Sequence, residues 1–186
     1  MENSEIVSRQ RDIAVKVLEK LSLVDPNAVL AGGAVRDWRF KLPATDLDFY
    51  LRTPNHYSIP LQEDLLAQVG FISVGEVSAS DPKYRCMNNI ERVYEASFDD
   101  QKCNIMVMAP RSWNWWYDFS NSLSECFMGV NGVACYTASF EKSILDKKVL
   151  VKVGYPHDHP HIMKIRNKFP SFTFEMKNKE EIEWLM

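Results

Sequence analysis

A glycine pair directly after a short apolar run is the feature that most constrains how this chain can fold. Gly32 and Gly33 follow the run AVLA (residues 28–31) and lead into AVRDWRF, which is typical of a short helix. Without a Cβ at either position, the backbone of this turn can lie directly against a ligand. The amides that open the next helix favour an anion, and Arg36 would add a guanidinium donor for phosphate. Taken alone, a glycine pair is more often a simple strand-to-helix turn.

Two carboxylates, Asp46 and Asp48, follow within the segment TDLDFYLR, which alternates as a strand does. Residues i and i+2 of a strand point to the same face, with Cα atoms roughly 7 Å apart. Two carboxylates on one face repel each other unless a cation lies between them, and Mg²⁺ is typically held by one or two carboxylates with substrate phosphates. Leu51 and Tyr57 stand where a calcium loop needs glycine and glutamate, which excludes that site. Turn or capping aspartates remain the alternative.

Length and composition indicate one ordinary globular unit. The chain has 186 residues, of which 46% are hydrophobic and 25% charged, with a net charge of −3 that argues against a general nucleic-acid binder. The N-terminus has no apolar stretch of the signal-peptide kind, and no apolar run reaches the roughly 20 residues of a membrane helix. The four cysteines are irregularly spaced and form no CxxC, which favours reduced thiols over a zinc site. We expect a cytoplasmic protein with no membrane partner.

Hydrophobic periodicity predicts an α+β (or α/β) fold, a small mixed β-sheet with flanking helices. Helices are expected at 5–23, 34–40, 61–70, 139–146 and 161–169, with a helical turn at 112–119 and a short C-terminal helix. Strands are expected at 28–31, 45–52, 71–77, 91–98, 102–109 and 148–153. The segment Asp25-Pro26-Asn27 should stop the first helix. The strands at 91–98 and 102–109, joined by Asp99-Asp100-Gln101, should form a hairpin, and the Asn131-Gly132 pair predicts a second hairpin with a type I′ turn. We expect a single domain over 1–186, with a core at 1–110 that carries the motifs and a C-terminal extension at 111–186 with a basic segment.

The segments LAGGAVRD and DLDFYL, in this order and at this distance, resemble the head-domain motif of the DNA polymerase β nucleotidyltransferase superfamily. The similarity is closest to CCA-adding enzymes and bacterial poly(A) polymerases. It implies a polymerase β-like fold in which Asp46 and Asp48 are catalytic and bind Mg²⁺ or Mn²⁺. Gly32 and Gly33 would face a nucleoside triphosphate (NTP), and a β-branched side chain at Gly33 would block that approach and fit badly at a positive φ. The resemblance further implies that Arg36 and Asp37 support the loop.

The chain departs from the superfamily pattern at two places. Many members carry a third carboxylate on a neighbouring strand, where KCNIMVM here offers Asn104, which can position a nucleotide but supplies no charge. A segment like RRDFTIN is echoed by YDFSNS, which keeps Asp118 and Phe119. Two functions stay open. One is a Mg²⁺-dependent nucleotidyltransferase that moves a nucleoside monophosphate from an NTP to a hydroxyl of an RNA 3′ end, a protein or a small molecule. The other is an inactive member that binds a nucleotide or a protein partner.

The sequence also lacks the long helical neck, body and tail with which CCA-adding enzymes hold tRNA. This favours a compact stand-alone transferase, as found in phages, toxins or mobile elements, over tRNA tailing. The NTP, the acceptor and the oligomeric state do not follow from the sequence.

Three further groups of side chains are candidates for binding, each with a plainer alternative. The basic run of the C-terminal third would contact phosphate or the acceptor together with Asp118, or would form a solvated helix face. Three alternating histidines would bind a transition metal only if other ligands completed the set. A tryptophan cluster would stack on a base, although packing is the better expectation. These groups are, in order, Lys164, Arg166 and Lys168; His157, His159 and His161; and Trp113, Trp115 and Trp116.

Overall fold

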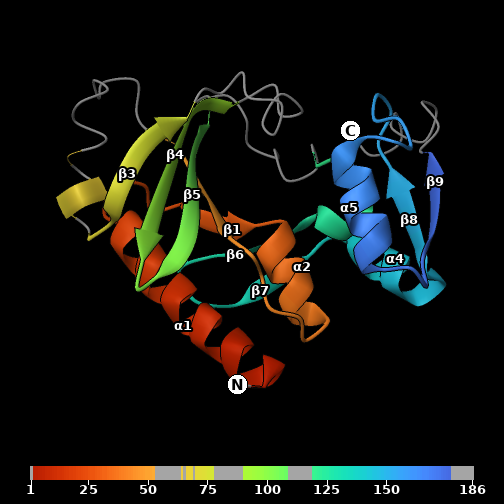
Figure 1. Cartoon of the computed structure of the whole chain (residues 1–186), viewed down its shortest axis with the longest axis horizontal. Coiled ribbons are helices and arrows are strands. Elements are labelled where there is room, and N and C mark those ends of the chain that lie inside the picture. The colour runs from red at the N-terminus through yellow and green to blue at the C-terminus, as the bar shows by residue number, and fades with distance from the viewer. Residues whose placement is uncertain are drawn as a thin grey trace.

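Helices and strands follow one another largely as the sequence predicted (Figure 1). The computed structural model describes residues 2–52, 64, 66–68, 70–77, 90–108 and 119–176. Its helices are α1 (Asn3–Leu21), α2 (Gly33–Arg39), α4 (Ala138–Asp146) and α5 (Pro160–Lys168), with a 3-10 turn, η2 (Ser122–Ser124). Its strands are β1 (Val29–Ala31), β2 (Leu47–Leu51), β3 (Ile72–Val77), β4 (Ile90–Phe98), β5 (Gln101–Met108), β6 (Cys126–Met128), β7 (Ala134–Tyr136), β8 (Lys148–Val151) and β9 (Thr173–Met176).

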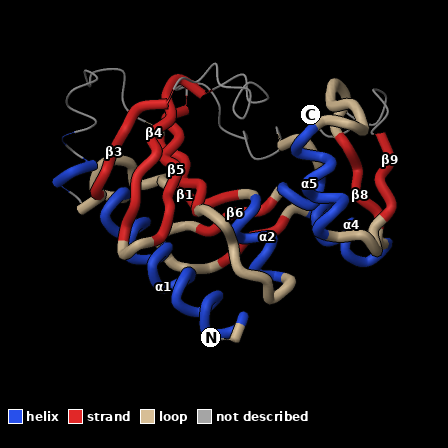
Figure 2. Tube along the Cα trace, viewed as in Figure 1, coloured by secondary structure: helices blue, strands red, loops and turns tan. Residues whose placement is uncertain are grey.

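The strands form one large sheet and one small one (Figure 2). The large sheet has seven strands in the order β3-β4-β5-β2-β1-β6-β7. β2 and β5 run parallel, whereas the other neighbouring pairs are antiparallel, so the sheet is mixed. β8 and β9 form a separate parallel pair. This architecture confirms the predicted α+β class.

The two faces of the large sheet differ in what covers them. α1 buries a stripe at helical spacing, including Ile13, Val17 and Leu21, in the main core. Because side chains alternate along a strand, the main core takes Phe49 from β2, whereas Tyr50 belongs to a second cluster on the opposite face. The even-numbered positions of β2 therefore look away from α1.

The first helix ends at Leu21, and a buried aspartate holds the loop that follows it. Asp25 accepts hydrogen bonds from the backbone N–H groups of Asn27 at 2.9 Å and of Arg52 at 2.6 Å. The second bond ties the loop after α1 to the end of β2. It thereby helps to fix the strand that carries Asp48.

The two predicted hairpins are present, but one turn type was wrong. β4 and β5 are joined through Asp99 and Asp100, which both have positive φ, the pattern that a type I′ turn requires. β6 and β7 were predicted to share such a turn at Asn131-Gly132. Their pairing instead ends at Met128 and Ala134, and of the two turn residues only Gly132 has positive φ. The longer loop removes the need for two left-handed residues in succession.

One strand was missed and some predictions fall outside the described residues. β9 pairs with β8, from which α5 separates it in the sequence, and its short, mostly exposed segment has no clear period. The predicted helical turn at 112–119, with its tryptophans, and the C-terminal helix lie outside the described residues except for Phe119. Of the helix predicted at 61–70, residues 64 and 66–68 are described as helical. Among the described residues, no helix combines the length and apolar character needed to cross a membrane.

α4, α5, β8 and β9 gather on the far side of α2 from α1 (Figure 1). Side chains from α2 and α5 nevertheless meet, because Lys168 donates a hydrogen bond to the Asp37 carboxylate. This contact brings the basic helix of the C-terminal third next to the glycine turn.

Candidate functional site

The glycine turn between β1 and α2 depends on Gly32 rather than on Gly33 for its shape. Gly32 has φ +75°, where a side chain would be strained, and a Cβ there would lie 3.3 Å from the Phe119 ring. Its N–H donates to the carbonyl of Cys126 on β6 at 2.9 Å. A Cβ on Gly33 would meet only the Arg36 Nη2 atom, at 3.7 Å, and Gly33 does not share the positive φ that the sequence led us to expect. The backbone at Gly33 is therefore free of strain.

Asp46 and Asp48 share a neighbour on the adjacent strand. Asp48 on β2 pairs in register with Asn104 on β5. The Asn104 Nδ2 atom lies 2.8 Å from the Asp48 Oδ1 atom and 3.4 Å from the Asp46 Oδ2 atom. The structure thus brings together both predicted carboxylates and the predicted amide.

The surroundings of Asp48 oppose its ionisation. Burial, and then the charge of Asp46, raises the pKa of Asp48 from 3.8 to about 6, although the Asn104 hydrogen bond, Lys164 and Arg36 lower it. Each pKa unit corresponds to about 1.4 kcal/mol between the two protonation states. A cation placed against this pair would relieve the repulsion that raises the pKa.

Asn104 is buried and has one unsatisfied atom. Its side chain is 4% exposed. Because its Nδ2 group faces the two carboxylates, its Oδ1 atom points elsewhere, and this oxygen has no hydrogen-bond partner within the described part of the chain. Buried polar atoms in native proteins are nearly always paired, so an orphaned amide oxygen indicates a missing ligand atom or water.

Arg36 and Asp37 support the glycine turn from within. The Arg36 guanidinium contacts Asp37 Oδ1 through two nitrogens, both at 2.9 Å, and both side chains are buried. Arg36 also donates to the Ser124 hydroxyl at 3.4 Å, and its guanidinium lies over the Phe169 ring. All three guanidinium nitrogens of Arg36 therefore already contact side chains of the protein.

One face of α5 completes the site. His161, Lys164, Ile165 and Lys168, at helical spacing, all line the same cavity as the two carboxylates. Arg166 lies off this face: its Nη2 atom is 3.2 Å from the His157 Nδ1 atom, and its guanidinium lies over the Phe174 ring. Two of the three predicted basic residues therefore reach the site. Asp118 lies outside the described residues.

These elements enclose a cavity of about 370 Å³. Asp46, Asp48 and Asn104 line it together with the glycine turn, α5 and the segment Phe119–Ser120. Tyr50 and Met106, from the same two central strands, add apolar surface. The cavity combines paired carboxylates, a close-approach backbone and lysines, the groups that a nucleotide phosphate chain with its cation requires.

The histidines do not form a metal site. His159 begins α5 as its N-cap, accepting from the His161 backbone N–H at 3.3 Å, and the two rings stack. No group of three or more His, Cys, Asp or Glu side chains in the described ranges is arranged to hold a metal ion. A cation at Asp46 and Asp48 would therefore draw its other ligands from water or from a substrate.

A buried glutamine on α1 also positions the site and was missed from the sequence. Gln10 donates to the carbonyl of Ala44 at 2.7 Å and accepts from the Ala44 N–H at 2.9 Å. It also accepts from the Trp38 indole at 3.2 Å. These bonds fix the chain two residues before Asp46. A polar residue on the apolar stripe of α1 was the feature that could have revealed it.

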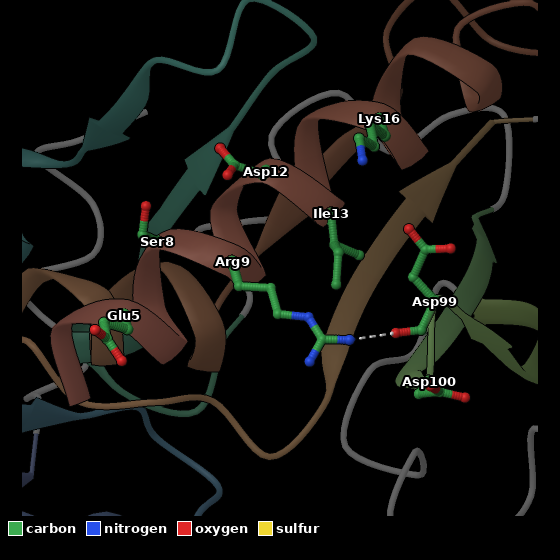
Figure 3. A pocket seen from close by; sticks show the side chains of 8 residues that line it. All are labelled: Glu5, Ser8, Arg9, Asp12, Ile13, Lys16, Asp99 and Asp100. Carbon is green, nitrogen blue, oxygen red and sulfur yellow. Dashed lines mark hydrogen bonds between the residues drawn. The ribbon is translucent and has the colours of Figure 1, made fainter. Parts of the chain in front are cut away.

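A second depression lies between α1 and the β4–β5 turn (Figure 3). It measures about 650 Å³ and is lined by charged side chains, among them Glu5, Asp12 and Asp100. The Arg9 side chain reaches across it and donates to the Asp99 carbonyl at 3.2 Å. We call this depression the α1 groove.

Comparison with known proteins gives structural but no sequence matches. No model of a known protein family matches the chain, and no curated protein sequence matches it. A solved tRNA-processing enzyme in an apo form has 16% identity over 90% of this chain and 44% of its own, with a TM-score of 0.60. The Bacillus stearothermophilus CCA-adding enzyme in complex with CTP has 16% identity over 88% of this chain and 40% of its own, with a TM-score of 0.57.

The Thermotoga maritima CCA-adding enzyme complexed with tRNA gives a similar result, with 14% identity over 94% of this chain and 43% of its own, and a TM-score of 0.59. The chain thus spans less than half the length of these proteins. At this identity the likeness concerns the fold: the chain has the nucleotidyltransferase fold that the Gly-Gly and Asp-x-Asp motifs predicted.

Proposed function

We propose that this protein is a divalent-cation-dependent nucleotidyltransferase, which moves a nucleoside monophosphate from an NTP to a hydroxyl acceptor. The observation that carries the proposal is the convergence of Asp46 and Asp48 on Asn104 inside a cavity that the glycine turn and Lys164 also line. The nucleotidyltransferase fold supports it, and solved proteins of this fold are complexed with CTP or with tRNA.

Asp46 and Asp48 would hold the cation, Mg²⁺ or Mn²⁺, together with phosphate oxygens of the nucleotide. The residues fit such an ion, because burial and the charge of Asp46 raise the cost of ionising Asp48, which a cation would lower. The buried amide oxygen of Asn104, which has no partner among the described residues, indicates a missing water or ligand atom nearby. When bound, the ion would stabilise the charge that develops on the transferred phosphoryl group.

The glycine turn and α5 would bind the rest of the nucleotide. Gly33 offers a backbone surface without a side chain, to which a phosphate can come close. Lys164, exposed at the rim of the cavity, would pair with a phosphate as a flexible point charge. Lys168 already pairs with Asp37 and would hold α5 against the glycine turn.

In the reaction, the acceptor hydroxyl oxygen forms a bond to the α-phosphorus while the bond from that phosphorus to the bridging oxygen breaks. Pyrophosphate leaves, and the hydroxyl proton passes to solvent or to a nearby base. The residues of this chain orient the α-phosphate between the glycine turn and the carboxylates. An RNA 3′ end, a protein or a small molecule would each present a suitable hydroxyl.

Asn104 favours a second candidate, a protein that binds a nucleotide without turnover. It stands in register with Asp48, on the neighbouring strand where many superfamily members carry a third carboxylate. An amide cannot replace that charge. Binding and transfer must therefore be measured separately.

Nucleotide binding is tested by the melting temperature with each NTP, with and without Mg²⁺. A ligand that binds only the native state raises its stability in proportion to RT ln(1 + [L]/Kd), so we expect a Mg²⁺-dependent rise. Transfer is tested by incorporation of α-³²P from each NTP into RNA or protein. A thermal shift without incorporation would select the non-catalytic candidate. If neither a thermal shift nor incorporation is found, both candidates are excluded.

Asp46→Asn should lower transfer by at least about 100-fold, because stabilisation of transition-state charge by a metal is worth several kcal/mol and about 1.4 kcal/mol is tenfold in rate. The substitution keeps the shape of the side chain, so the fold should persist. Asn104→Ala is the matched comparison, and it should cost less, because Asn104 positions groups and neutralises no cation. Wild-type rates in Asp46→Asn would contradict the mechanism.

A further inference from the structure

A row of three polar side chains crosses the sheet beside the carboxylates. Asp48 on β2, Asn104 on β5 and Glu95 on β4 are successive partners across three neighbouring strands. Asn104, the central member, turns its N–H donors toward Asp48 and Asp46. The side of the carboxylate pair that faces β5 is therefore occupied by hydrogen-bond donors, which repel a cation.

The remaining carboxylates of the cavity are already neutralised. Asp37 pairs with Arg36 and Lys168. Glu95 pairs with Lys102 at 3.2 Å. Among the described residues that line the cavity, this leaves Asp46 and Asp48 as the negative charges for a metal, and the charge of Lys164 on α5 acts on Asp48. Two carboxylates and one lysine carry a net charge of −1, so the nucleotide phosphates supply the rest of the charge for one divalent ion. For a second ion, the described part of the cavity offers no third carboxylate outside an ion pair.

Rotation of the Asn104 amide would not create a second site without cost. Turning Oδ1 toward the carboxylates would break the 2.8 Å bond to Asp48. It would also move the NH₂ group into the buried position where Oδ1 now has no partner. An unsatisfied buried donor costs roughly as much as the lost hydrogen bond, so the amide favours its present orientation unless a strong ligand replaces the bond.

We propose that this site holds a single divalent cation, the one that arrives with the nucleoside triphosphate, because Asn104 stands where a third carboxylate would be needed to hold a second cation. The inference rests on the proposed nucleotide site. Two-metal sites place their ions about 4 Å apart, and such ions repel strongly unless shared carboxylates surround them. In this chain, Lys164 supplies the additional positive charge near the phosphates.

The number of ions is measured with Mn²⁺, whose electron paramagnetic resonance spectrum reports on a neighbouring Mn²⁺. Two ions about 4 Å apart are magnetically coupled, whereas a single ion gives an ordinary six-line spectrum. The sample is the full chain, saturated with the α,β-methylene analogue of ATP or CTP, whichever gives the larger thermal shift. Mn²⁺ is added at up to three equivalents per complex.

We expect an uncoupled spectrum from the wild type and from Asn104→Ala, and a coupled spectrum from Asn104→Asp, which supplies the third carboxylate. A coupled spectrum from the wild type would overturn the proposal. So would an uncoupled spectrum from a folded Asn104→Asp protein with the same number of bound ions as the wild type. A coupled spectrum from Asn104→Ala would also overturn it, because that variant adds no carboxylate. The wild type and Asn104→Ala therefore decide the question if Asn104→Asp fails to fold.

Failure of the proposed function gives a different result. If the carboxylates do not bind a metal, Asp46→Asn leaves the amount of protein-bound Mn²⁺ unchanged. A single ion lost in Asp46→Asn supports both proposals. Two coupled ions, both lost in Asp46→Asn, keep the proposed function and reject the single-ion site.

Discussion

The α1 groove is larger than the cavity at Asp46 and Asp48, but the smaller cavity has more of the features of a binding site. The α1 groove measures about 650 Å³ and the cavity at Asp46 and Asp48 about 370 Å³. The charged side chains of the groove are exposed, so water screens them, and surface charges of this kind contribute little to stability. The smaller cavity instead contains a partly buried carboxylate with a raised pKa and an amide oxygen without a partner. Unsatisfied buried groups, rather than volume, therefore make the smaller cavity the candidate site.

The number of elements that contribute also differs. The α1 groove is formed by one helix and one hairpin turn, and Arg9 reaches across it to a backbone carbonyl (Figure 3). The cavity takes side chains from α2, from β2 and β5, and from α5. Substitutions should therefore affect nucleotide binding in the cavity and leave it unchanged in the groove.

The largest expected effect is from Gly33→Val. A Cβ at Gly33 meets nothing closer than 3.7 Å, so the fold should persist, while the branched side chain fills the space over the turn. We expect the nucleotide-dependent thermal shift to disappear and the melting temperature without nucleotide to fall by only a few degrees. Ser8→Val in the α1 groove is the control and should bind nucleotide as the wild type does. Unchanged affinity in a folded Gly33→Val protein would show that the turn has no binding role.

An intermediate effect is expected from Lys164→Gln. A hydrogen bond to a charged group contributes roughly 1.5–3 kcal/mol, so the Kd for the nucleotide should rise at least tenfold. Arg166→Gln removes the same charge from the same helix but from a side chain that contacts His157, and it should change the Kd less than about twofold. Isothermal titration calorimetry measures both. Equal losses would mean that the net charge of α5 matters and its orientation does not.

The smallest effect concerns stability without metal. The folded state raises the pKa of Asp48 to about 6, so its contribution to stability is fully present below about pH 4 and is lost as the pH rises through 6. Asp48→Asn should therefore raise the melting temperature by roughly 5 °C at pH 7.5 and very little at pH 4. Asp12→Asn, on an exposed position of the α1 groove, should change neither value. A rise of equal size at both pH values would contradict this account of Asp48.

Local patterns predicted most of the elements because the information for them is local. The apolar period of α1, the turn at Asp25 that follows the helix and the β4–β5 hairpin depend on residues close together in sequence. β9 and the β6–β7 turn were not predicted correctly. The conformation of β9 follows from its pairing with β8, and that of the β6–β7 turn follows from the register at which the hairpin pairing ends. Neither is visible in a short window of sequence.

By itself, the sequence determined that a glycine turn precedes two carboxylates at strand spacing, because backbone freedom and the period of a strand are properties of the local chain. Only the tertiary structure decided that Asn104 lies against both carboxylates, since the parallel pairing of β2 and β5 joins residues 56 positions apart. Packing also decided that Lys164 faces the cavity while Arg166 does not. Helical spacing sets which residues share a face, but which face is turned inward depends on what the helix packs against.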